Sequence, residues 1–430
     1  MLQCSKKVLP NGLRLVAVTM PHLHSAEIAV YLKTGGRNDP PGQAGISHFL
    51  EHMLFRGTRE FATSLELEIA FEAIGGSVNA ATDEETTCYF SRIHPERIAR
   101  GVELFSSMLL RPALTGIETE RKIITEEALE DINEKGLETN TSNLASNLLW
   151  PGHPLGIPTI GYLETINGIG ENDLRVHLAN CYVPSNALIV AAGNFDPELF
   201  FSACAVSFAD WRGEEAPQPV PATDSQDEPR ALFVKDSDSQ VNLQIAFRGF
   251  ARKDPRIMVL RLLRRILCGG GSSRLHLNLR EEHGIVYSVD ASLAAYDETG
   301  AFAIELATAP ENLELAVGEV LREVRRLACE PVGAAELARA KEGYFYDLHY
   351  SSDSTYEMQV RYGWGELMQM VRTIEEDRKE AAAIDPAEIR RISRALFAPH
   401  NINLAAVGPW KAPVRQAVEK LIGAYHKGWE

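Results

Sequence analysis

The sequence predicts an α+β fold made of two duplicated domains, each a mostly antiparallel or mixed sheet with helices packed on one face. Three observations lead to this prediction: segments that recur at a fixed offset, a polar stretch midway along the chain, and short strand patterns grouped with helical ones. Because the helical patterns cluster between pairs of strands, a sheet with helices on one face is favoured over a parallel, doubly wound sheet.

The recurring segments indicate that the chain is a duplication. The strand-like run at 26–32 (AEIAVYL) resembles the run at 241–247 (VNLQIAF), which lies 215 positions later. The segment from Tyr182 to Gly193 resembles the segment from Phe397 to Gly408 at the same offset, whereas VNAA and VDAS in the middle match at 211. An offset of this length predicts two similar domains rather than a solenoid.

The boundary between the domains is predicted from a polar segment. Residues 211–229 (WRGEEAPQPVPATDSQDEP) are rich in Pro, Glu and Asp and have no apolar periodicity. This composition is typical of a solvated linker. We therefore expect domains at 1–210 and 230–430.

Within each half, apolar periodicity predicts the individual elements. Period-two patterns predict strands in both halves, and periods near 3.6 predict the helices. The expected strands are 13–19, 26–34, 85–93, 187–193, 231–235, 241–248, 286–295, 301–307 and 402–407. The expected helices are 45–56, 64–74, 95–110, 117–133, 139–149, 255–267, 273–281, 310–328, 333–350 and 386–397.

Composition limits the classes of function. The chain has 430 residues and a formal net charge of −16, which argues against nucleic acid or an anionic membrane as the main partner. An acidic surface fits plain solubility, or an electronegative site that attracts basic peptides. The six scattered cysteines form no C-x-x-C pair, and Pro10, Asn11 and Gly12 interrupt the N-terminal apolar residues. We expect a soluble, cytoplasmic protein without a membrane span.

One predicted helix carries a metal-binding pattern. In GISHFLEHMLFRG, His48 and His52 are four positions apart, so their imidazoles project from one face of the helix. Glu51 lies on the same general side, where a carboxylate can reach a metal-bound water without being a ligand. This is H-x-x-E-H, the inverted form of the H-E-x-x-H zinc motif. Since a catalytic zinc keeps three protein ligands, a third is required. Two histidines at this spacing also occur by chance on packed helices.

The candidate third ligand lies in the helix-like stretch ERKIITEEALEDINE. Glu120 and Glu127 are seven positions apart and share one face with apolar neighbours. Carboxylates on such a face are costly unless they are paired with a cation.

Together these residues resemble the pitrilysin family of inverzincins, which includes insulin-degrading enzyme and the mitochondrial processing peptidase. The family places a ligand glutamate well downstream of H-x-x-E-H, and the interval from His52 to Glu127 matches the family spacing. The resemblance implies that His48, His52 and Glu127 bind one Zn²⁺ per chain, with Glu120 supporting the site. It also implies that GGSVNAATDEETTCYF is a strand beside the cleft, with Asn79 and Ala80 contacting the substrate.

The C-terminal half carries a match of its own. GGGSSRLHLNLREEHGIVYSV is similar to the family segment whose Arg and Tyr, seven apart, reach the active site from the second domain. Those positions are Arg280 and Tyr287 here. Taken alone, they read as a surface charge and a half-buried strand aromatic.

The expected activity is that of a zinc endopeptidase, with Glu51 as general base, Tyr287 stabilising the tetrahedral intermediate and Arg280 fixing the substrate. The resemblance implies that a chain of this length dimerises to complete a chamber for peptides or unfolded segments. A homodimer is expected, and a heterodimer with a related subunit stays open. Two alternatives are a non-catalytic scaffold subunit of the same fold and a zinc enzyme of another class. The natural substrate is left open.

Overall fold

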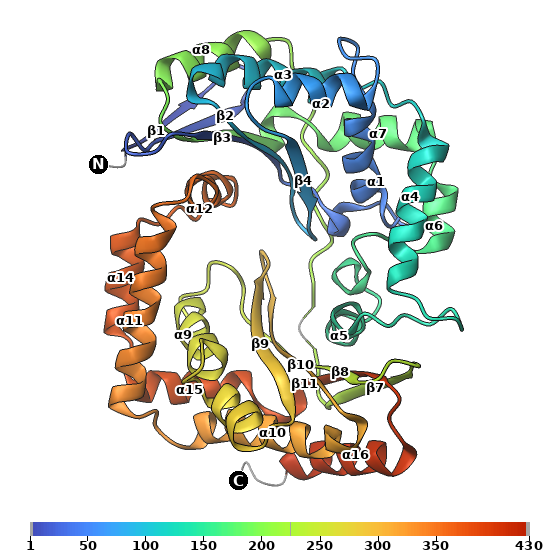
Figure 1. The fold of residues 1–430 in the computed structure, drawn as a ribbon, viewed down its shortest axis with the longest axis vertical. Helices are drawn as coiled ribbons and strands as arrows, with labels where there is room; N and C mark the ends of the chain where they lie inside the picture. The colour runs from blue at the N-terminus through green and yellow to red at the C-terminus, as the bar shows by residue number, and fades with distance from the viewer. Residues whose placement is uncertain (1–2, 224, 427–430) are drawn as a thin grey trace. The chain divides into compact units, whose positions relative to one another are not determined.

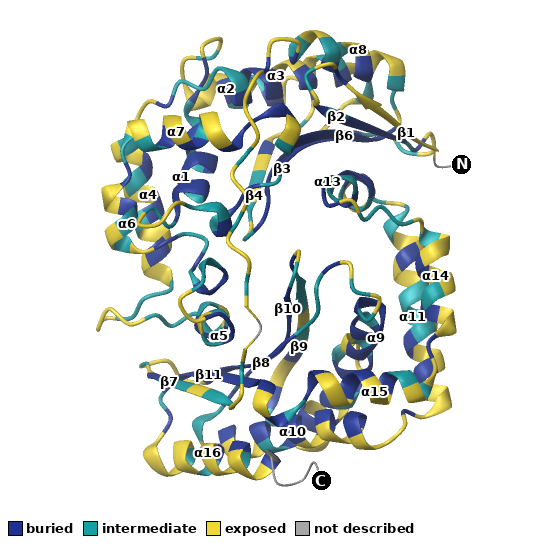
Figure 2. Ribbon diagram, turned by 180° about the vertical axis from the view of Figure 1, so that it is seen from behind, coloured by how far each residue is buried: buried dark blue, intermediate teal, exposed yellow. Residues whose placement is uncertain are grey.

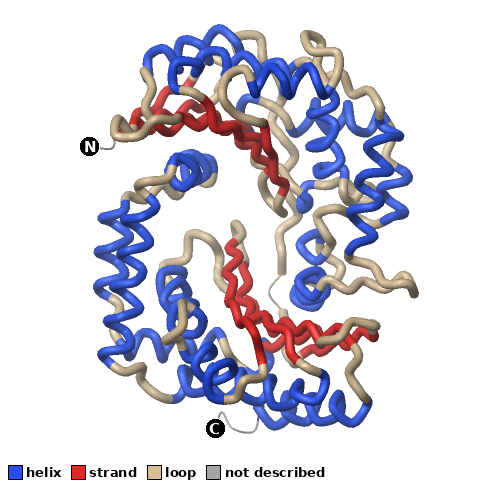
Figure 3. The backbone as a smooth tube through the Cα atoms, in the orientation of Figure 1, coloured by secondary structure: helices blue, strands red, loops and turns tan. Residues whose placement is uncertain are grey.

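The computed structural model describes residues 3–223 and 225–426 (Figure 1). Its contacts divide the chain into two compact units, each a sheet with helices, as Figure 3 shows. The predicted α+β fold class is therefore confirmed. Residues 1, 2, 224 and 427–430, which the predicted domains and linker include, lie outside the described residues.

The first unit contains a six-stranded sheet in the order β1-β2-β6-β3-β5-β4. β2 and β6 pair in parallel, and every other pair is antiparallel. The sequence analysis missed β1, because all six of its residues are exposed and it lacks the apolar alternation of a half-buried strand. The strands are β1 (Gln3–Val8), β2 (Arg14–Thr19), β3 (Ala26–Leu32), β4 (Val78–Thr82), β5 (Thr87–Ile93) and β6 (Ala187–Gly193).

Most helices of this unit cover one face of the sheet and enclose its main core, and a smaller group covers the central strands on the opposite face. Figure 2 shows the central strands β3 and β6 buried, because helices lie on both of their faces. The helices of this unit are α1 (Ile46–Met53), α2 (Ser64–Glu72), α3 (Ile98–Leu110), α4 (Ile117–Glu130), α6 (Leu163–Gly168), α7 (Glu171–Cys181), α8 (Pro197–Ser207), α12 (Thr355–Gln359) and α13 (Gly365–Leu367).

The second unit contains a five-stranded sheet in the order β7-β11-β8-β10-β9, with β7 and β11 parallel. The strands are β7 (Arg230–Lys235), β8 (Val241–Arg248), β9 (Val286–Ala295), β10 (Gly300–Thr308) and β11 (Ile402–Gly408). The helices are α5 (Thr141–Leu149), α9 (Ile257–Cys268), α10 (Leu313–Cys329), α11 (Ala334–Ser351), α14 (Ile374–Ala383), α15 (Pro386–Leu396) and α16 (Ala412–His426), with a π-helical turn at His276–Glu282.

The two sheets have the same topology once β1 is set aside, as a duplication requires. The strands β3 and β8, and likewise β6 and β11, begin at the offset that the sequence repeats predicted. Gly193 and Gly408 end equivalent strands with φ of 136° and 144°. A Cβ on either glycine would lie 2.3–2.4 Å from the carbonyl oxygen of Ser25 or Gln240, which are equivalent positions in the two halves. Both positions therefore need glycine for the same reason.

The units differ from the predicted contiguous domains, because each half contributes a segment to the other unit. Glu130–Gly156 belongs to the second unit and His349–Thr373 to the first. α5 packs on β8 and β11, and α12 packs on β3 and β6. The starts of these two helices are separated by nearly the same offset as the strands, so the helices are counterparts in the duplication. Each covers the sheet face opposite the main helical layer, where an apolar surface would otherwise face water.

Among the described residues, no helix combines the length and apolar character needed to cross a membrane. All six cysteines are free thiols.

Candidate metal centre

The helix α1 is amphipathic, and its apolar side fixes the orientation of its polar side. Ile46, Phe49, Leu50 and Met53 follow the helical spacing and are fully buried in the core of the first unit. A short 3₁₀ turn at Leu54–Arg56 continues α1. Gly57 then ends it at φ 120°, directly after the helix expected at 45–56.

A buried carboxylate stabilises the start of α1. The residue before the helix is Gly45, which has no capping side chain. Asp39 supplies the missing acceptor: Oδ2 accepts from the Gly45 amide at 2.6 Å, and Oδ1 accepts from the Ser47 amide at 3.2 Å and from its hydroxyl at 2.6 Å. Its carboxylate thus acts as an N-cap from outside the helix. Burial raises the pKa of Asp39 to about 7, against the lowering effect of these hydrogen bonds.

Ser47 also connects α1 to α7. Its hydroxyl lies 3.0 Å from Nε2 of His177, which is 3% exposed. Burial lowers the pKa of His177 to about 4, so this imidazole is neutral near pH 7. The sequence analysis singled out neither Asp39 nor His177, since their role depends on contacts to Ser47 from elsewhere in the chain.

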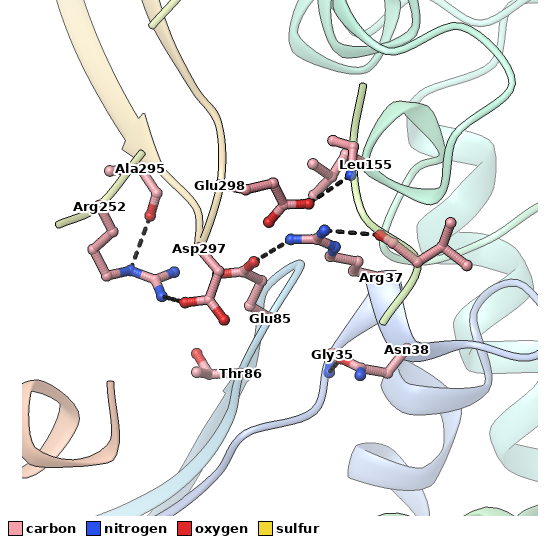
Figure 4. A network of polar contacts seen from close by, with 12 residues as sticks. Gly35, Arg37, Asn38, Glu85, Thr86, Leu155, Arg252, Ala295, Asp297 and Glu298 are labelled. Carbon is pink, nitrogen blue, oxygen red and sulfur yellow. Dashed lines mark hydrogen bonds and ion pairs between the residues drawn. The ribbon is translucent and has the colours of Figure 1, made fainter. Parts of the chain in front are cut away.

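The loop that carries Asp39 is itself held by a buried ion pair. Arg37 is 3% exposed, and its Nη1 lies 2.5 Å from Oε1 of Glu85 (Figure 4). Its Nη2 donates to the carbonyl of Val220 at 2.8 Å. Breaking a buried pair leaves one charge uncompensated, which is strongly destabilising. In the second unit, Arg252 makes a similar contact with Asp297 at 2.6 Å.

His48, His52 and Glu127 come together at the exposed side of α1. The imidazole centroids of His48 and His52 are 4.6 Å apart. Nε2 of His48 lies 3.6 Å from Oε1 of Glu127, and Nε2 of His52 lies 3.6 Å from Oε2 of the same carboxylate. One donor atom from each residue falls within 4.8 Å of the others.

This donor set fits zinc. A tetrahedral Zn²⁺ with ligands at about 2.1 Å requires donor atoms roughly 3.4 Å apart, close to the two 3.6 Å separations here. Neutral imidazole is the form that binds a metal. Burial and the neighbouring His52 lower the pKa of His48 to about 3, which keeps it neutral.

Glu120 positions His52. Its Oε1 lies 2.9 Å from Nδ1 of His52, which leaves Nε2 of that ring turned toward Glu127. The other oxygen lies 3.4 Å from Nη1 of Arg56. Burial lowers the pKa of His52, but the hydrogen bond to Glu120 and the nearby carboxylates outweigh it and raise the pKa. Glu120 is 6% exposed, whereas the side chain of Glu127 is 46% exposed. The two carboxylates therefore occupy different environments on one helix.

Glu51 lies beside the three donors without belonging to the cluster. It is 8% exposed, and its Oε2 accepts a hydrogen bond from the hydroxyl of Thr82, at the end of β4. Burial raises the pKa of Glu51, and the hydrogen bond from Thr82 opposes this. A buried carboxylate with a raised pKa suits proton transfer near neutral pH.

The other predicted site residues are divided between the two units. Asn79 and Ala80 lie on β4, an edge strand of the first sheet that is exposed at alternate residues. Arg280 and Tyr287 belong to the second unit. Tyr287 is 85% exposed rather than half-buried, and the Arg280 guanidinium lies 5.8 Å from its ring centroid. Their approach to the metal centre stays a prediction.

The second unit has no equivalent metal centre among the described residues. There α9 packs near the edge strand β9, much as α1 packs near β4. Its sequence, IMVLRLLRRILC, contains no His, Asp or Glu. The cluster on α1 and α4 is the one group of three His, Cys, Asp or Glu side chains with metal-binding geometry in the described parts of both units.

Comparisons with known proteins find matches along most of the chain. Residues 14–161 match the family model described as "Insulinase (Peptidase family M16)", and residues 169–344 match the one described as "Peptidase M16 inactive domain". An uncharacterized zinc protease of Rickettsia bellii is 30% identical over 340 residues, covering 77% of this chain and 80% of the relative. One from Bacillus subtilis is 28% identical over 402 residues, covering 93% and 97%.

Solved structures show the same fold at lower identity. A protease from Helicobacter pylori superposes with a TM-score of 0.88 at 20% identity, covering 95% of this chain and 100% of that one. A chain of complex III from Candida albicans gives 0.82 at 18% identity, covering 97% and 99%.

Proposed function

Because the chain belongs to the insulinase family of peptidases (peptidase family M16), we propose that it is a zinc-dependent endopeptidase acting on peptides or unfolded segments. The observation that carries this proposal is the convergence of His48, His52 and Glu127, with Glu51 beside them. All four side chains are of the types that the reaction requires. A fold likeness alone would not distinguish a peptidase from a scaffold.

We assign the ligand roles to His48 Nε2, His52 Nε2 and the Glu127 carboxylate, with one zinc ion per chain. When bound there, zinc would lower the pKa of a coordinated water and polarise the peptide carbonyl. Glu120 fixes the tautomer and orientation of His52 through the contact at Nδ1. Asp39 and Ser47 hold the start of α1, and with it the backbone that carries His48.

Glu51 is the proposed general base. It takes a proton from the attacking water and passes it to the nitrogen of the leaving amine, so that the carboxylate is regenerated. The hydroxyl of Thr82 orients the Glu51 carboxylate by donating to Oε2. Because Oε1 of Glu51 is not used in this hydrogen bond, we expect Oε1 to face the attacking water.

The substrate would lie along β4. This strand ends the sheet, so its outer edge can pair with an extended peptide. Asn79 and Ala80 are then the contact positions. We further propose that Tyr287 donates a hydrogen bond to the developing oxyanion and that Arg280 fixes the substrate backbone or a carboxylate. The exposure of Tyr287 supports this role, since the hydroxyl is free to meet a ligand.

The remaining parts of the proposal rest on the resemblance. We propose a homodimer that encloses a peptide chamber; a heterodimer with a related subunit is the alternative. The six free thiols suit a reducing compartment such as the cytoplasm. The net charge of −16 favours basic peptides as substrates.

The substitution Glu51→Gln tests the proposal. We expect hydrolysis of a quenched fluorescent peptide library to fall by about 10²–10⁴-fold, which is the contribution of a positioned acid–base group. Zinc content, measured by mass spectrometry, should stay near one per chain. The exposed Glu72→Gln on α2 serves as the matched control and should keep full activity. Full hydrolysis by Glu51→Gln would refute the role of this residue.

A scaffold subunit is the second candidate. The likeness to a complex III chain favours it at the level of fold, and the intact donor set argues against it. A wild-type protein that binds zinc but cleaves no peptide in the library would support the scaffold.

A further inference from the structure

The helix α4 carries both carboxylates of the metal centre, but its apolar seam is narrow. The apolar residues that it packs into the core of the first unit are Ile117, Ile124 and Ala128. At about 3.6 residues per turn they span roughly 40° of the helix circumference, whereas the apolar stripe of a typical surface helix is about 100° wide or more. Ile123 and Leu129 are 47% and 42% exposed. Apolar packing therefore fixes the rotation of α4 about its axis only weakly.

The rotation of α4 decides whether its carboxylates reach the histidines of α1. Helical side chains lie about 5–6 Å from the axis, so a rotation of about 20° displaces them by about 2 Å. Metal–ligand distances in a zinc site vary by about 0.2 Å. Glu120 and Glu127 lie on the same side of the apolar seam, so one rotation would move both away from His52. The site therefore needs a contact that holds α4 in one orientation.

Arg121 lies on the other side of the seam and joins α4 to α6 and α1, which lie beside it in Figure 1. Its Nη1 donates to the carbonyl of Ile166, in the last turn of α6, and its Nη2 donates to the carbonyl of Ile169 at 2.8 Å. Carbonyls at the end of a helix lack intrahelical donors, and a guanidinium can supply them. The same guanidinium lies 5.4 Å from the ring centroid of Phe49, the fully buried residue after His48 on α1.

The guanidinium fixes a direction as well as a distance. The Arg121 side chain is 13% exposed, and its Nη2 also lies 3.2 Å from Oε1 of Glu118, one turn earlier on α4. Its donors are held in a rigid plane, so two hydrogen bonds to the end of α6 define the orientation of the group. A lysine ammonium is a point charge on a flexible stem and would define only the distance.

From this geometry we propose that Arg121 is a positioning residue of the metal centre, which locks the rotation of α4 so that Glu127 meets the metal and Glu120 meets His52. Arg121 itself is outside the group of donor atoms. The role rests on the proposed peptidase function, because it assigns a residue to the support of the same zinc site. It deepens that proposal by naming the contact that places the third ligand.

The test measures competition for Zn²⁺ between the zinc-free protein and a chelator of known affinity. Arg121→Met removes the guanidinium but keeps an apolar stem, and we expect about 10- to 100-fold weaker zinc binding, the range for groups that orient a metal ligand. Arg121→Lys keeps the charge but loses the paired hydrogen bonds, so we expect a smaller loss. Lys122→Met, which removes an exposed cation of the same helix, is the matched control and should keep the wild-type affinity. Wild-type affinity in Arg121→Met would overturn the proposal.

A second background separates the positioning of α4 from a general effect on the fold. In Glu120→Ala/Glu127→Ala, α4 offers no carboxylate to the metal or to His52, and we expect weak residual zinc binding by the two histidines. Adding Arg121→Met to this background should leave the residual affinity unchanged. The same fold-loss in both backgrounds would show that Arg121 acts through α1 or through overall stability, and would overturn the proposal. If Arg121→Met does not fold, Arg121→Lys is judged in both backgrounds by the same criteria.

The positioning role and the peptidase function can fail separately. A wild type that binds zinc and cleaves peptides, with equal zinc affinity in Arg121→Met, would overturn the positioning role alone. A loss of zinc affinity in Arg121→Met, with no hydrolysis by the wild type, would overturn the peptidase function and leave the positioning role standing. A wild type that binds no zinc would overturn both.

Discussion

Substitution of Glu120 tests whether this carboxylate stabilises zinc binding by positioning His52, without being a ligand itself. Glu120 is 6% exposed, and its Oε1 lies 2.9 Å from Nδ1 of His52. It does not belong to the group of donor atoms formed by His48, His52 and Glu127. Groups that orient a metal-bound histidine typically contribute about 10- to 100-fold to metal affinity. Glu120→Gln keeps an oxygen that can accept from Nδ1 but loses the charge, so we expect about tenfold weaker zinc binding. Glu120→Ala loses both, and we expect about 100-fold, or roughly 2.7 kcal/mol.

The assay is competition for zinc against a chelator of known affinity, with thermal unfolding of the zinc-free proteins measured in parallel. Glu126→Gln and Glu126→Ala are the matched controls, because Glu126 is exposed on the same helix. Zinc-free Glu120 variants that unfold near the wild-type temperature would show that the loss concerns the metal. Equal zinc affinity in Glu120→Ala and wild type would refute the positioning role of this carboxylate.

Two further predictions concern the support of α1 and the oxyanion. Neutral His177 binds fewer protons in the folded protein (pKa about 4) than in the unfolded chain, where histidine titrates near 6.5. The free energy of unfolding should therefore fall by about 3 kcal/mol as the pH falls from 6.5 to 4. Denaturant titrations at several pH values should show that His177→Gln removes this loss of stability. The same pH dependence of stability in His177→Gln and wild type would contradict the prediction. Tyr287→Phe should lower kcat roughly 10²-fold with little change in KM, because the variant lacks the hydroxyl that would stabilise the oxyanion. Tyr346→Phe, at an exposed tyrosine of α11, is the control and should keep the wild-type kcat. Steady-state kinetics test this, and a wild-type kcat in Tyr287→Phe would exclude the hydroxyl from the reaction.

The polar network around α1 explains why the helix needs more than its own sequence. Its apolar stripe selects the buried face, but Gly45 leaves the first turn without a capping side chain. Asp39 supplies that acceptor from the preceding loop, and Arg37 holds the loop through Glu85. The orientation of His48 therefore depends on residues that bind no metal.

Several features were predictable from the sequence because they depend on near neighbours. The apolar spacing on α1, the separation of His48 from His52 and the end of the helix at Gly57 follow from helical geometry alone. The constant offset between similar segments predicted the duplication, and the two sheets confirm it through their shared strand order. Glu127 was singled out because it shares a helix face with Glu120 and apolar neighbours, and because its spacing from His52 matches a family resemblance.

Other features were decided only by the tertiary structure. The sequence by itself determined many of the strands and helices and the helix that carries the histidines, since those choices depend on side-chain periodicity within a few turns. It did not predict β1 or the helices α7, α8, α14 and α16. It did not determine that residues 130–156 pack in the second unit and residues 349–373 in the first, because such contacts depend on the path of the chain. Nor did it show that Glu120 is buried while the Glu127 side chain is 46% exposed. The physical reason is that burial and ion pairing are properties of the packed surface, on which residues distant in sequence become neighbours.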